Sequence, residues 1–507
     1  MALGRQRLTD SQRSFGGGLN TVADESQLAG NELRRAANCR LTEFGGVTKR
    51  LGSQRTHSSS IGTGQPVRGG FAWIKPTSVQ ELAVSNGTLY TGTYSIGMSW
   101  TAQAGALTST VYPSFAPFRE NSGADVVYIA DGGLLNKWDG TTFTVNIAST
   151  PSVKRVCVYN RRLFGIGDTA QPTRLYYSAL DNGDSLGITG SAGGAADIRT
   201  FGFMDLVGLM VIGGSLLIFH RQGISRFTGW SQDDIAIQSG TVGISSDVGT
   251  IAPDSLVSVE NVGFFLSDRG IYSVTEEGVE PISTKIEADI EAALQTNFLR
   301  VKTAHNKSAR EVLFYIPDLG VYVYNYRLRA WSGPWTGVFT DVTTYSLWPT
   351  LDTDSNPIVL MGGGDGFVRH VDKSGVYKDD VISAGTGGAT FTMIAQCRRM
   401  FFGDSAADKS LRWGYLVGNL RGSITTGIEW NTRTGQESYT VPATAGGIWG
   451  AGTWGSGFWG GSGSDTFRIP MSGRGTFVDV TMTDAAEAAP LFSSFEVEGF
   501  YMTRRGG

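Results

Sequence analysis

The carboxylate side chains in the turns of this chain are the first residues whose type could support catalysis. Glycoside hydrolysis needs two carboxyl groups close together, and sialidases add an arginine cluster and Ser-x-Asp-x-Gly-x-x-Trp turns. The nearest segment here is Ser267-Asp268-Arg269-Gly270, in which serine and aspartate are adjacent and no tryptophan follows. Aspartate is also common in turns because it tolerates turn geometry and hydrogen-bonds its own backbone. We therefore interpret the turn aspartates as structural residues.

The histidines, cysteines and serines show no pattern of a metal site or an activated nucleophile. The four histidines are scattered, without an HExxH motif or a paired spacing: His57, His220, His305 and His370. The three cysteines are far apart and lack a CxxC pair, which predicts neither a disulfide framework nor a zinc site: Cys39, Cys157 and Cys397. No Gly-x-Ser-x-Gly elbow lies between a predicted strand and a helix. The sequence therefore predicts a protein without enzymatic activity, metal or cofactor.

Apolar strands and glycine turns form a unit that recurs along the middle of the chain. The clearest copy runs from Leu82 to Tyr90, with Asn86-Gly87 at its centre. Equivalent turns lie at residues 132, 173, 223, 270, 320 and 366, which gives intervals of 45, 41, 50, 47, 50 and 46 residues. Asn-Gly and Asp-Gly between apolar runs are typical of β-hairpins, because a positive φ angle is favourable there. A period near ~45 residues is typical of four-stranded blades, so the sequence predicts a mainly β fold with a β-propeller of six to seven repeats.

The composition agrees with many short strands joined by turns. The 507 residues include 70 Gly, 12 Trp, 17 Tyr and 26 Phe, and only 17% are charged. The net charge is −4 and there is no long basic run, which disfavours a protein that grips nucleic acid through its phosphates. The N-terminus lacks the apolar region of a secretory signal, and no apolar run approaches the ~18 residues of a membrane span. We expect a chain made in the cytoplasm without stable membrane insertion.

The chain divides into three zones. Residues 1–60 are polar and irregular, residues 61–384 contain the repeats, and residues 385–507 have strand-like runs without the repeat period. Because both end zones lack the repeat and domain termini often approach each other, we expect them to form one β-rich platform outside the propeller.

Two helices are expected within this β-rich chain. A short helix is predicted over residues 31–37, which are rich in Leu, Arg and Ala. A second helix follows the capping box Thr284-x-x-Glu287, with apolar residues at helical spacing: Ile286, Ile290, Ala293 and Leu294.

The C-terminal zone contains a glycine-rich segment with a tryptophan every five residues: Trp449, Trp454 and Trp459. This spacing fits neither a helix nor a strand, so the segment is predicted to be a loop anchored by its rings. The rings would pack into the core of the chain or contact a neighbouring subunit, where tryptophan is enriched. A third interpretation is that they stack on sugar rings.

The order of several motifs resembles one known family. An N-terminal hook, Phe15-Gly16-Gly17-Gly18-Leu19-Asn20, is followed by Asn38. The motif ends at the basic pair Lys49-Arg50, here called the close. The middle contains Leu313-Phe314-Tyr315-Ile316-Pro317 and, further on, Trp331. In this order the features are similar to those of the tail nozzle proteins, also called tail tubular protein B, of short-tailed bacteriophages.

The resemblance implies a structural virion protein of the phage tail. In that family a homohexamer lies under the head-to-tail adaptor and extends the DNA exit channel. It implies contact with the adaptor and with tail fibres or tailspikes, while double-stranded DNA passes through the lumen without specific binding. A glycan-binding or glycan-hydrolysing β-propeller of a phage tail is the alternative. We expect partner contacts from the hook, the close and the tryptophan segment: Phe15, Gly16, Gly17, Gly18, Leu19, Asn20, Asn38, Lys49, Arg50, Trp449, Trp454 and Trp459.

Overall fold

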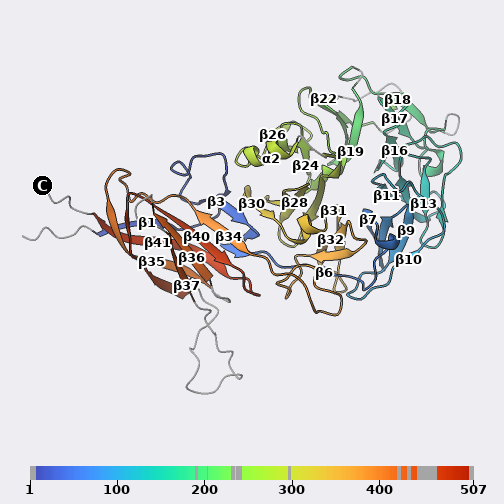
Figure 1. The fold of residues 1–507 in the computed structure, drawn as a ribbon. Coiled ribbons are helices and arrows are strands. Elements are labelled where there is room, and N and C mark those ends of the chain that lie inside the picture. The colour runs from blue at the N-terminus through green and yellow to red at the C-terminus, as the bar shows by residue number, and fades with distance from the viewer. Residues whose placement is uncertain are drawn as a thin grey trace, which may run out of the picture.

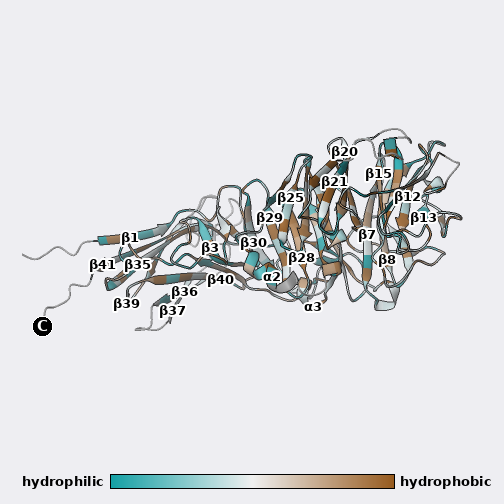
Figure 2. Ribbon diagram, turned by 90° about the horizontal axis from the view of Figure 1, so that it is seen from above, coloured by the Kyte–Doolittle hydropathy of each residue, from teal (hydrophilic) through white to brown (hydrophobic). Residues whose placement is uncertain are grey.

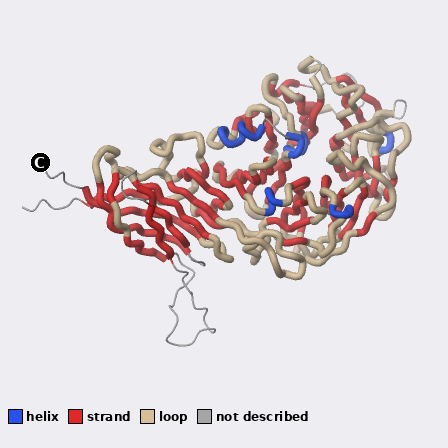
Figure 3. The backbone as a smooth tube through the Cα atoms, in the orientation of Figure 1, coloured by secondary structure: helices blue, strands red, loops and turns tan. Residues whose placement is uncertain are grey.

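The computed structural model describes residues 7–188, 192–202, 204–229, 234–235, 242–294, 298–419, 424–430, 436–441 and 465–501. Strands predominate in these residues, and the helices are short (Figure 3). A ring of β-sheets forms a propeller, and an elongated β-rich platform extends from one side of the ring (Figure 1). The predicted mainly β fold with a propeller and a platform is confirmed.

Six separate four-stranded sheets form blades of the propeller. The first two blades are β7 (Val67–Ile74), β8 (Val79–Ser85), β9 (Thr88–Gly92) and β10 (Thr101–Ala102), then β11 (Ser114–Arg119), β12 (Asp125–Ala130), β13 (Asn136–Trp138) and β14 (Phe143–Thr144). The next two are β15 (Arg155–Tyr159), β16 (Arg162–Ile166), β17 (Arg174–Tyr177) and β18 (Gly194–Asp197), then β19 (Leu206–Ile212), β20 (Ser215–His220), β21 (Gly223–Phe227) and β22 (Val242–Ser245). The fifth is β23 (Val257–Val259), β24 (Val262–Ser267), β25 (Gly270–Val274) and β26 (Val279–Pro281). The last is β31 (Thr344–Leu351), β32 (Pro357–Gly363) and β33 (Val368–Val371), completed by β6 (Gln54–Arg55).

A further four-stranded unit lies between the fifth and the last of these blades. It comprises β27 (Lys302–Asn306), β28 (Glu311–Ile316), β29 (Gly320–Asn325) and β30 (Ala330–Trp335). The first strands of successive units lie side by side around the ring, and β31 returns to β7. Four of the seven predicted turn positions fall between the second and third strands of a unit, and the other three are the first residue of the third strand: Gly223, Gly270 and Gly320. At the first of them, Asn86 and Gly87 have φ angles of 50° and 73°, as a tight hairpin turn requires.

The blades are stabilised by apolar side chains on both faces of each sheet. All six residues of β20 are buried, and Figure 2 shows hydrophobic segments along the blade strands. Between the first and second blades, Trp73 and Leu82 pack with Ile129 and Trp138. Each sheet therefore needs neighbours on both sides, which explains why the units close into a ring.

The platform is a two-layer sandwich built from both ends of the chain. In one sheet the strand order is β4 (Cys39–Leu41), β5 (Val47–Lys49), β41 (Leu491–Tyr501), β35 (Lys409–Asn419) and β38 (Asp465–Pro470). In the same sheet β1 (Arg7–Gln12) pairs with β41, and β39 (Arg474–Gly475) pairs with β35. The other contains β3 (Glu32–Ala37), β34 (Met393–Cys397), β40 (Val478–Asp484), β36 (Ile424–Trp430) and β37 (Gln436–Val441), with β2 (Gly18–Leu19) parallel to β3. Buried residues of both sheets, such as Met482 and Phe495, belong to one hydrophobic cluster.

The propeller and the platform share a sheet. Strand β30 of the propeller pairs with β3 of the platform through Ala36 and Gly333, and the resulting sheet has ten strands. The joint is therefore crossed by hydrogen-bonded strands in addition to the connecting loops.

One predicted helix is confirmed and the other is wrong. Helix α2 (Glu287–Leu294) follows the predicted capping box, and Ile286 and Ile290 are fully buried. The predicted helix over residues 31–37 is instead strand β3. Pairing with β2, β30 and β34 supplies its hydrogen bonds, so tertiary context overrides the helix propensity of Leu, Arg and Ala. The remaining helical turns are short: η1 (Gly62–Gly64), η2 (Gly183–Ser185), η3 (Pro253–Ser255), η4 (Phe298–Arg300) and α3 (Val338–Asp341).

The N-terminal zone closes the propeller. Strand β6 is the outer strand of the last blade, where Gln54 lies opposite His370, so this part of residues 1–60 belongs to the propeller. The first and last blades are further joined by buried polar contacts. The Tyr94 hydroxyl lies 2.6 Å from Nδ1 of His370, and the Trp348 indole donates to Glu81 at 2.9 Å.

Glu81 makes the stability of this closure depend on pH. It is fully buried, it accepts hydrogen bonds from Trp348 and Thr350, and no cation pairs with it among the described residues. Burial raises the pKa of Glu81 from 4.5 to about 7. Because the folded pKa is the higher one, the stability from the protonated form is complete below pH 4.5 and is lost as the pH rises through about 7.

Glu81→Gln should therefore become more stable relative to the unmodified protein as the pH rises. From about pH 5 to about pH 8 the difference in unfolding free energy should shift in favour of the variant by roughly 3 kcal/mol. Unfolding by denaturant at several pH values measures this difference. Parallel pH profiles of the two proteins would contradict the prediction.

Candidate functional site

The predicted partner-binding residues near the N-terminus lie at the platform and its joint with the propeller. The buried hook residues Phe15 and Leu19 belong to the cluster that both sheets share. The backbone N–H of Phe15 donates to the Gly45 carbonyl at 2.6 Å. The Asn20 amide donates to the Glu32 carboxylate at 3.0 Å. In this structure the hook residues therefore pack within their own subunit, in the core of the platform.

Two of the three glycines of the hook are required by close packing. A Cβ atom on Gly17 would lie 2.6 Å from the Asn31 side chain. Gly18 has a φ angle of +70°, and a Cβ atom there would lie 2.5 Å from the Trp331 carbonyl oxygen of β30. Gly16 has more room, with the nearest atom at 3.4 Å. The hook therefore contacts both the platform and the propeller unit that continues into it.

Arg50 is buried where the two parts of the chain meet, and all five of its guanidinium N–H groups have acceptors. Nε donates to Asn38 Oδ1 at 3.0 Å. Nη1 donates to the Leu51 carbonyl at 3.0 Å and to Asp379 Oδ1 at 2.8 Å. Nη2 donates to the Thr336 carbonyl at 2.9 Å and to Asp379 Oδ2 at 2.5 Å. This bidentate pairing compensates a charge that is only 1% exposed.

Aromatic rings enclose the Arg50 guanidinium. Its central carbon lies 3.7 Å from the ring centroid of Phe391, 5.4 Å from that of Phe339 and 6.0 Å from that of Trp335. Phe391 lies near the start of the C-terminal zone, whereas Trp335 is the last residue of β30 and Phe339 lies in helix α3. Arg50 thus joins the N-terminal zone, the propeller and the start of the C-terminal zone.

Asn38 orients Arg50 and ties the same segments together. It adopts a left-handed conformation with φ 53°, which asparagine tolerates better than most residues. Its Oδ1 accepts from Arg50 Nε and, at 2.9 Å, from the backbone N–H of Thr336. Its Nδ2 donates to the Thr392 carbonyl at 2.9 Å.

Lys49 makes the neighbouring contact with the platform. Its Nζ donates to the Ala486 carbonyl at 2.7 Å, lies 3.3 Å from Asp484 Oδ2 and lies 4.7 Å above the Phe391 ring. Burial lowers the pKa of Lys49 and raises the pKa of Asp484. Both pKa shifts favour the uncharged forms, because burying the two charges costs free energy. The hydrogen bonds of Lys49 offset part of this cost.

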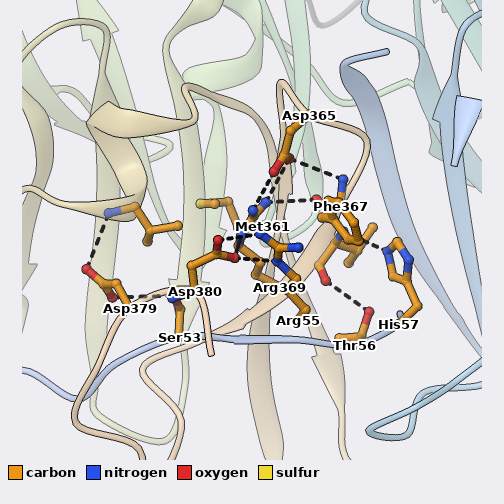
Figure 4. Close-up of polar contacts among 12 residues, drawn as sticks. Ser53, Arg55, Thr56, His57, Met361, Asp365, Phe367, Arg369, Asp379 and Asp380 are labelled. Carbon is orange, nitrogen blue, oxygen red and sulfur yellow. Dashed lines mark hydrogen bonds and ion pairs between the residues drawn. The ribbon is translucent and has the colours of Figure 1, made fainter. Parts of the chain in front are cut away.

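A second ion network fixes β6 to the last blade (Figure 4). Arg369 is fully buried and pairs with Asp365 at 2.6 Å and Asp380 at 2.7 Å. Arg55 of β6 also binds Asp380, at 2.6 Å, and lies 4.1 Å above the Phe367 ring. Burial alone would raise the pKa of Asp380, but the hydrogen bonds that it accepts from the two arginines lower it. The network therefore stabilises the closed ring through charges from both ends of the propeller.

A pair of carboxylates comes together elsewhere, between the second and third blades. The Tyr128 hydroxyl lies 2.7 Å from Glu120 and 2.8 Å from Asp184. Lys137 lies 3.2 Å and 2.6 Å from the same two carboxylates. Since Lys137 and Tyr128 occupy the space between them, the arrangement fits a structural contact between blades.

The described residues contain no group of three or more His, Cys, Asp or Glu side chains suited to hold a metal ion. Burial lowers the pKa of the histidines, that of His370 to about 4. It raises the pKa of the thiols, to about 12 at Cys157 and Cys397. In the same residues no helix is long and apolar enough to cross a bilayer.

The structure therefore brings the hook, Asn38, Lys49 and Arg50 to the platform and its joint with the propeller, inside one chain. Contact of these residues with another protein stays a prediction. The remaining predicted residues lie outside the described part of the chain: Trp449, Trp454 and Trp459. Asp379 and Phe391 were not predicted, because they follow Arg50 by more than 300 residues and belong to no motif.

No protein-family model matches the chain, and no curated protein gives a significant match.

Arg50→Ala should destabilise the protein by about 3–5 kcal/mol, because it leaves Asp379 buried without its partner. The double variant Arg50→Met/Asp379→Leu should recover much of this loss, since it removes both charges. Arg119→Ala is the control: Arg119 is 71% exposed, and losing its pair with Asp125 should cost about 1 kcal/mol or less. Denaturant unfolding measures all three variants. An equal loss of unfolding free energy in Arg50→Ala and Arg119→Ala would contradict the role assigned to the buried pair.

Proposed function

We propose that this chain is a structural virion protein that forms the distal tail nozzle of a short-tailed bacteriophage. It acts as a homohexamer under the head-to-tail adaptor, and viral double-stranded DNA passes through its lumen. The resemblance of the N-terminal hook, of the close at Lys49-Arg50 and of the segment around Trp331 supports this proposal. These motifs pack on one another at the joint, as Gly18 does on the Trp331 carbonyl.

The observation that carries the proposal is the ten-stranded sheet shared by propeller and platform. A subunit in the wall of a tube must keep its two parts in a constant orientation when DNA moves past it. The strand pairing at Ala36 and Gly333, together with the buried Arg50–Asp379 pair, resists bending at the joint. A propeller that only binds a small ligand has no need of such a joint.

The charge of the chain is compatible with a DNA channel. Six copies would carry about −24, so the assembly as a whole would not attract the phosphate backbone. Many arginines of the described residues already pair with carboxylates, among them Arg55, Arg369 and Arg399. DNA would therefore slide through the lumen without a specific site.

The decisive measurement is the location of this chain in virions. A reconstruction of the phage tail should show six copies in one ring at the distal end, in contact with the adaptor ring above. Tail fibres or tailspikes should attach at the side of the same assembly. Finding the chain in the capsid shell, or as a trimeric spike at the tail periphery, would contradict the proposal and favour the glycan-binding or glycan-hydrolysing alternative.

The proposal also predicts that the purified chain does not hydrolyse host polysaccharide. Glu120 and Asp184 form a close carboxylate pair, and Glu120→Gln tests it directly. Release of reducing sugar should stay at the level of a protein-free control for both proteins. Hydrolysis by the unmodified chain that is lost in Glu120→Gln would overturn the structural assignment.

A further inference from the structure

The first strands of the blades surround a cavity on the propeller axis. Its volume is about 250 Å³, and residues of β7, β11, β15, β19, β27 and β31 line it. The charged residues of this lining are three bases and one acid: Arg68, Arg155, Lys302 and Asp254. The lining therefore has an excess of positive charge, in contrast to the chain as a whole.

Asp254 is shared by two of the three cations. Its Oδ1 lies 3.0 Å from Nη2 of Arg155, and its Oδ2 accepts from Nζ of Lys302. Arg155 also donates to the Tyr112 carbonyl at 2.9 Å, but its buried Nε has no hydrogen-bond partner in the described part of the chain. One carboxylate cannot neutralise both bases.

Arg68 pairs with no carboxylate of the described part of the chain. In the described residues its guanidinium makes no hydrogen bond or ion pair, and it packs near two rings, 5.5 Å from the centroid of Tyr112 and 5.2 Å from that of Tyr345. A further cation, Arg300, lies 5.3 Å from the Tyr345 ring. Lys302 lies 3.5 Å from the Tyr112 ring, so the two tyrosines place several cations around one space.

The concentration of positive charge is unfavourable without a counter-ion. Burial lowers the pKa of Lys302 to about 8, and Arg155 and Arg68 contribute to this shift although Asp254 opposes it. Like charges in a partly buried site repel each other more strongly than in water. An anion in the cavity would relieve this repulsion and use the free donors of Arg68.

We propose that the axial cavity of the propeller binds a small ligand through a multiply charged oxyanion, either phosphate or carboxylate. Arg68 would be its main donor, with Arg155 and Lys302 supplying further positive charge. A larger cavity of about 670 Å³ shares Arg155 and Pro253 with this one, and its lining combines apolar residues such as Leu206 and Phe298 with charged ones such as Asp168 and Arg221. It leaves room for an organic part of the ligand. The proposal is independent of the assembly into a nozzle.

Calorimetric titration of the full chain with inorganic phosphate and, separately, with citrate tests the site. At least one of them should bind with a one-to-one stoichiometry, and the stronger of the two identifies the ligand as a phosphate or a carboxylate. Arg68→Gln should weaken binding by about tenfold or more, because a charge-assisted hydrogen bond is lost. This variant should fold, since Arg68 makes no ion pair that its loss would leave incomplete.

Arg119→Gln is the matched control, because Arg119 is an exposed arginine of the neighbouring blade that pairs with Asp125. It should bind the anion as tightly as the unmodified protein. Asp254→Asn should act in the opposite direction to Arg68→Gln and strengthen binding, since it removes the competing carboxylate. No binding of either anion, or equal affinities of Arg68→Gln and Arg119→Gln, would overturn the proposal.

Discussion

The burial of a single guanidinium group determines how the two halves of this molecule fit together. Arg50 can leave water only if each of its donors finds an acceptor, and the acceptors come from the N-terminal zone, from the end of β30 and from the connector after the last blade. These segments must therefore meet in one arrangement. The pairing of Ala36 in β3 with Gly333 in β30 adds a backbone contact at the same joint.

The same N-terminal zone serves both parts of the protein. Strands β1 to β5 belong to the platform, and β6, only a few residues after Arg50, completes the last blade. Charged residues fix both attachments, Arg50 with Asp379 in one and Arg55 with Asp380 in the other. Two adjacent carboxylates thus bind two arginines that act on different domains, so the platform and the closed ring are coupled through a short stretch of chain.

The sequence predicts the propeller well because its signals are local. A hairpin such as Asn86-Gly87 depends on two residues and their immediate neighbours, and its recurrence gives the ring. The local pattern of residues 31–37 predicts a helix, whereas the hydrogen-bond partners of strand β3 come from distant segments that no local pattern reveals. The sequence predicts Arg50 as a contact residue but not its partner Asp379, since a buried ion pair has no characteristic spacing. The charge excess on the axis was missed for the same reason: Arg68, Arg155 and Lys302 come from three separate blades.

The closure of the last blade by β6 has a consequence for biosynthesis. Residues 54–55 leave the ribosome early, but their partner strand β33 and the carboxylates of Asp379 and Asp380 follow more than 300 residues later. The earlier blades can pair internally as they emerge, because each is a local meander. The ring itself can close only when translation has passed the last repeat. Until then the nascent chain is an open arc with two unpaired ends, and unpaired strand edges are sites at which other chains can pair.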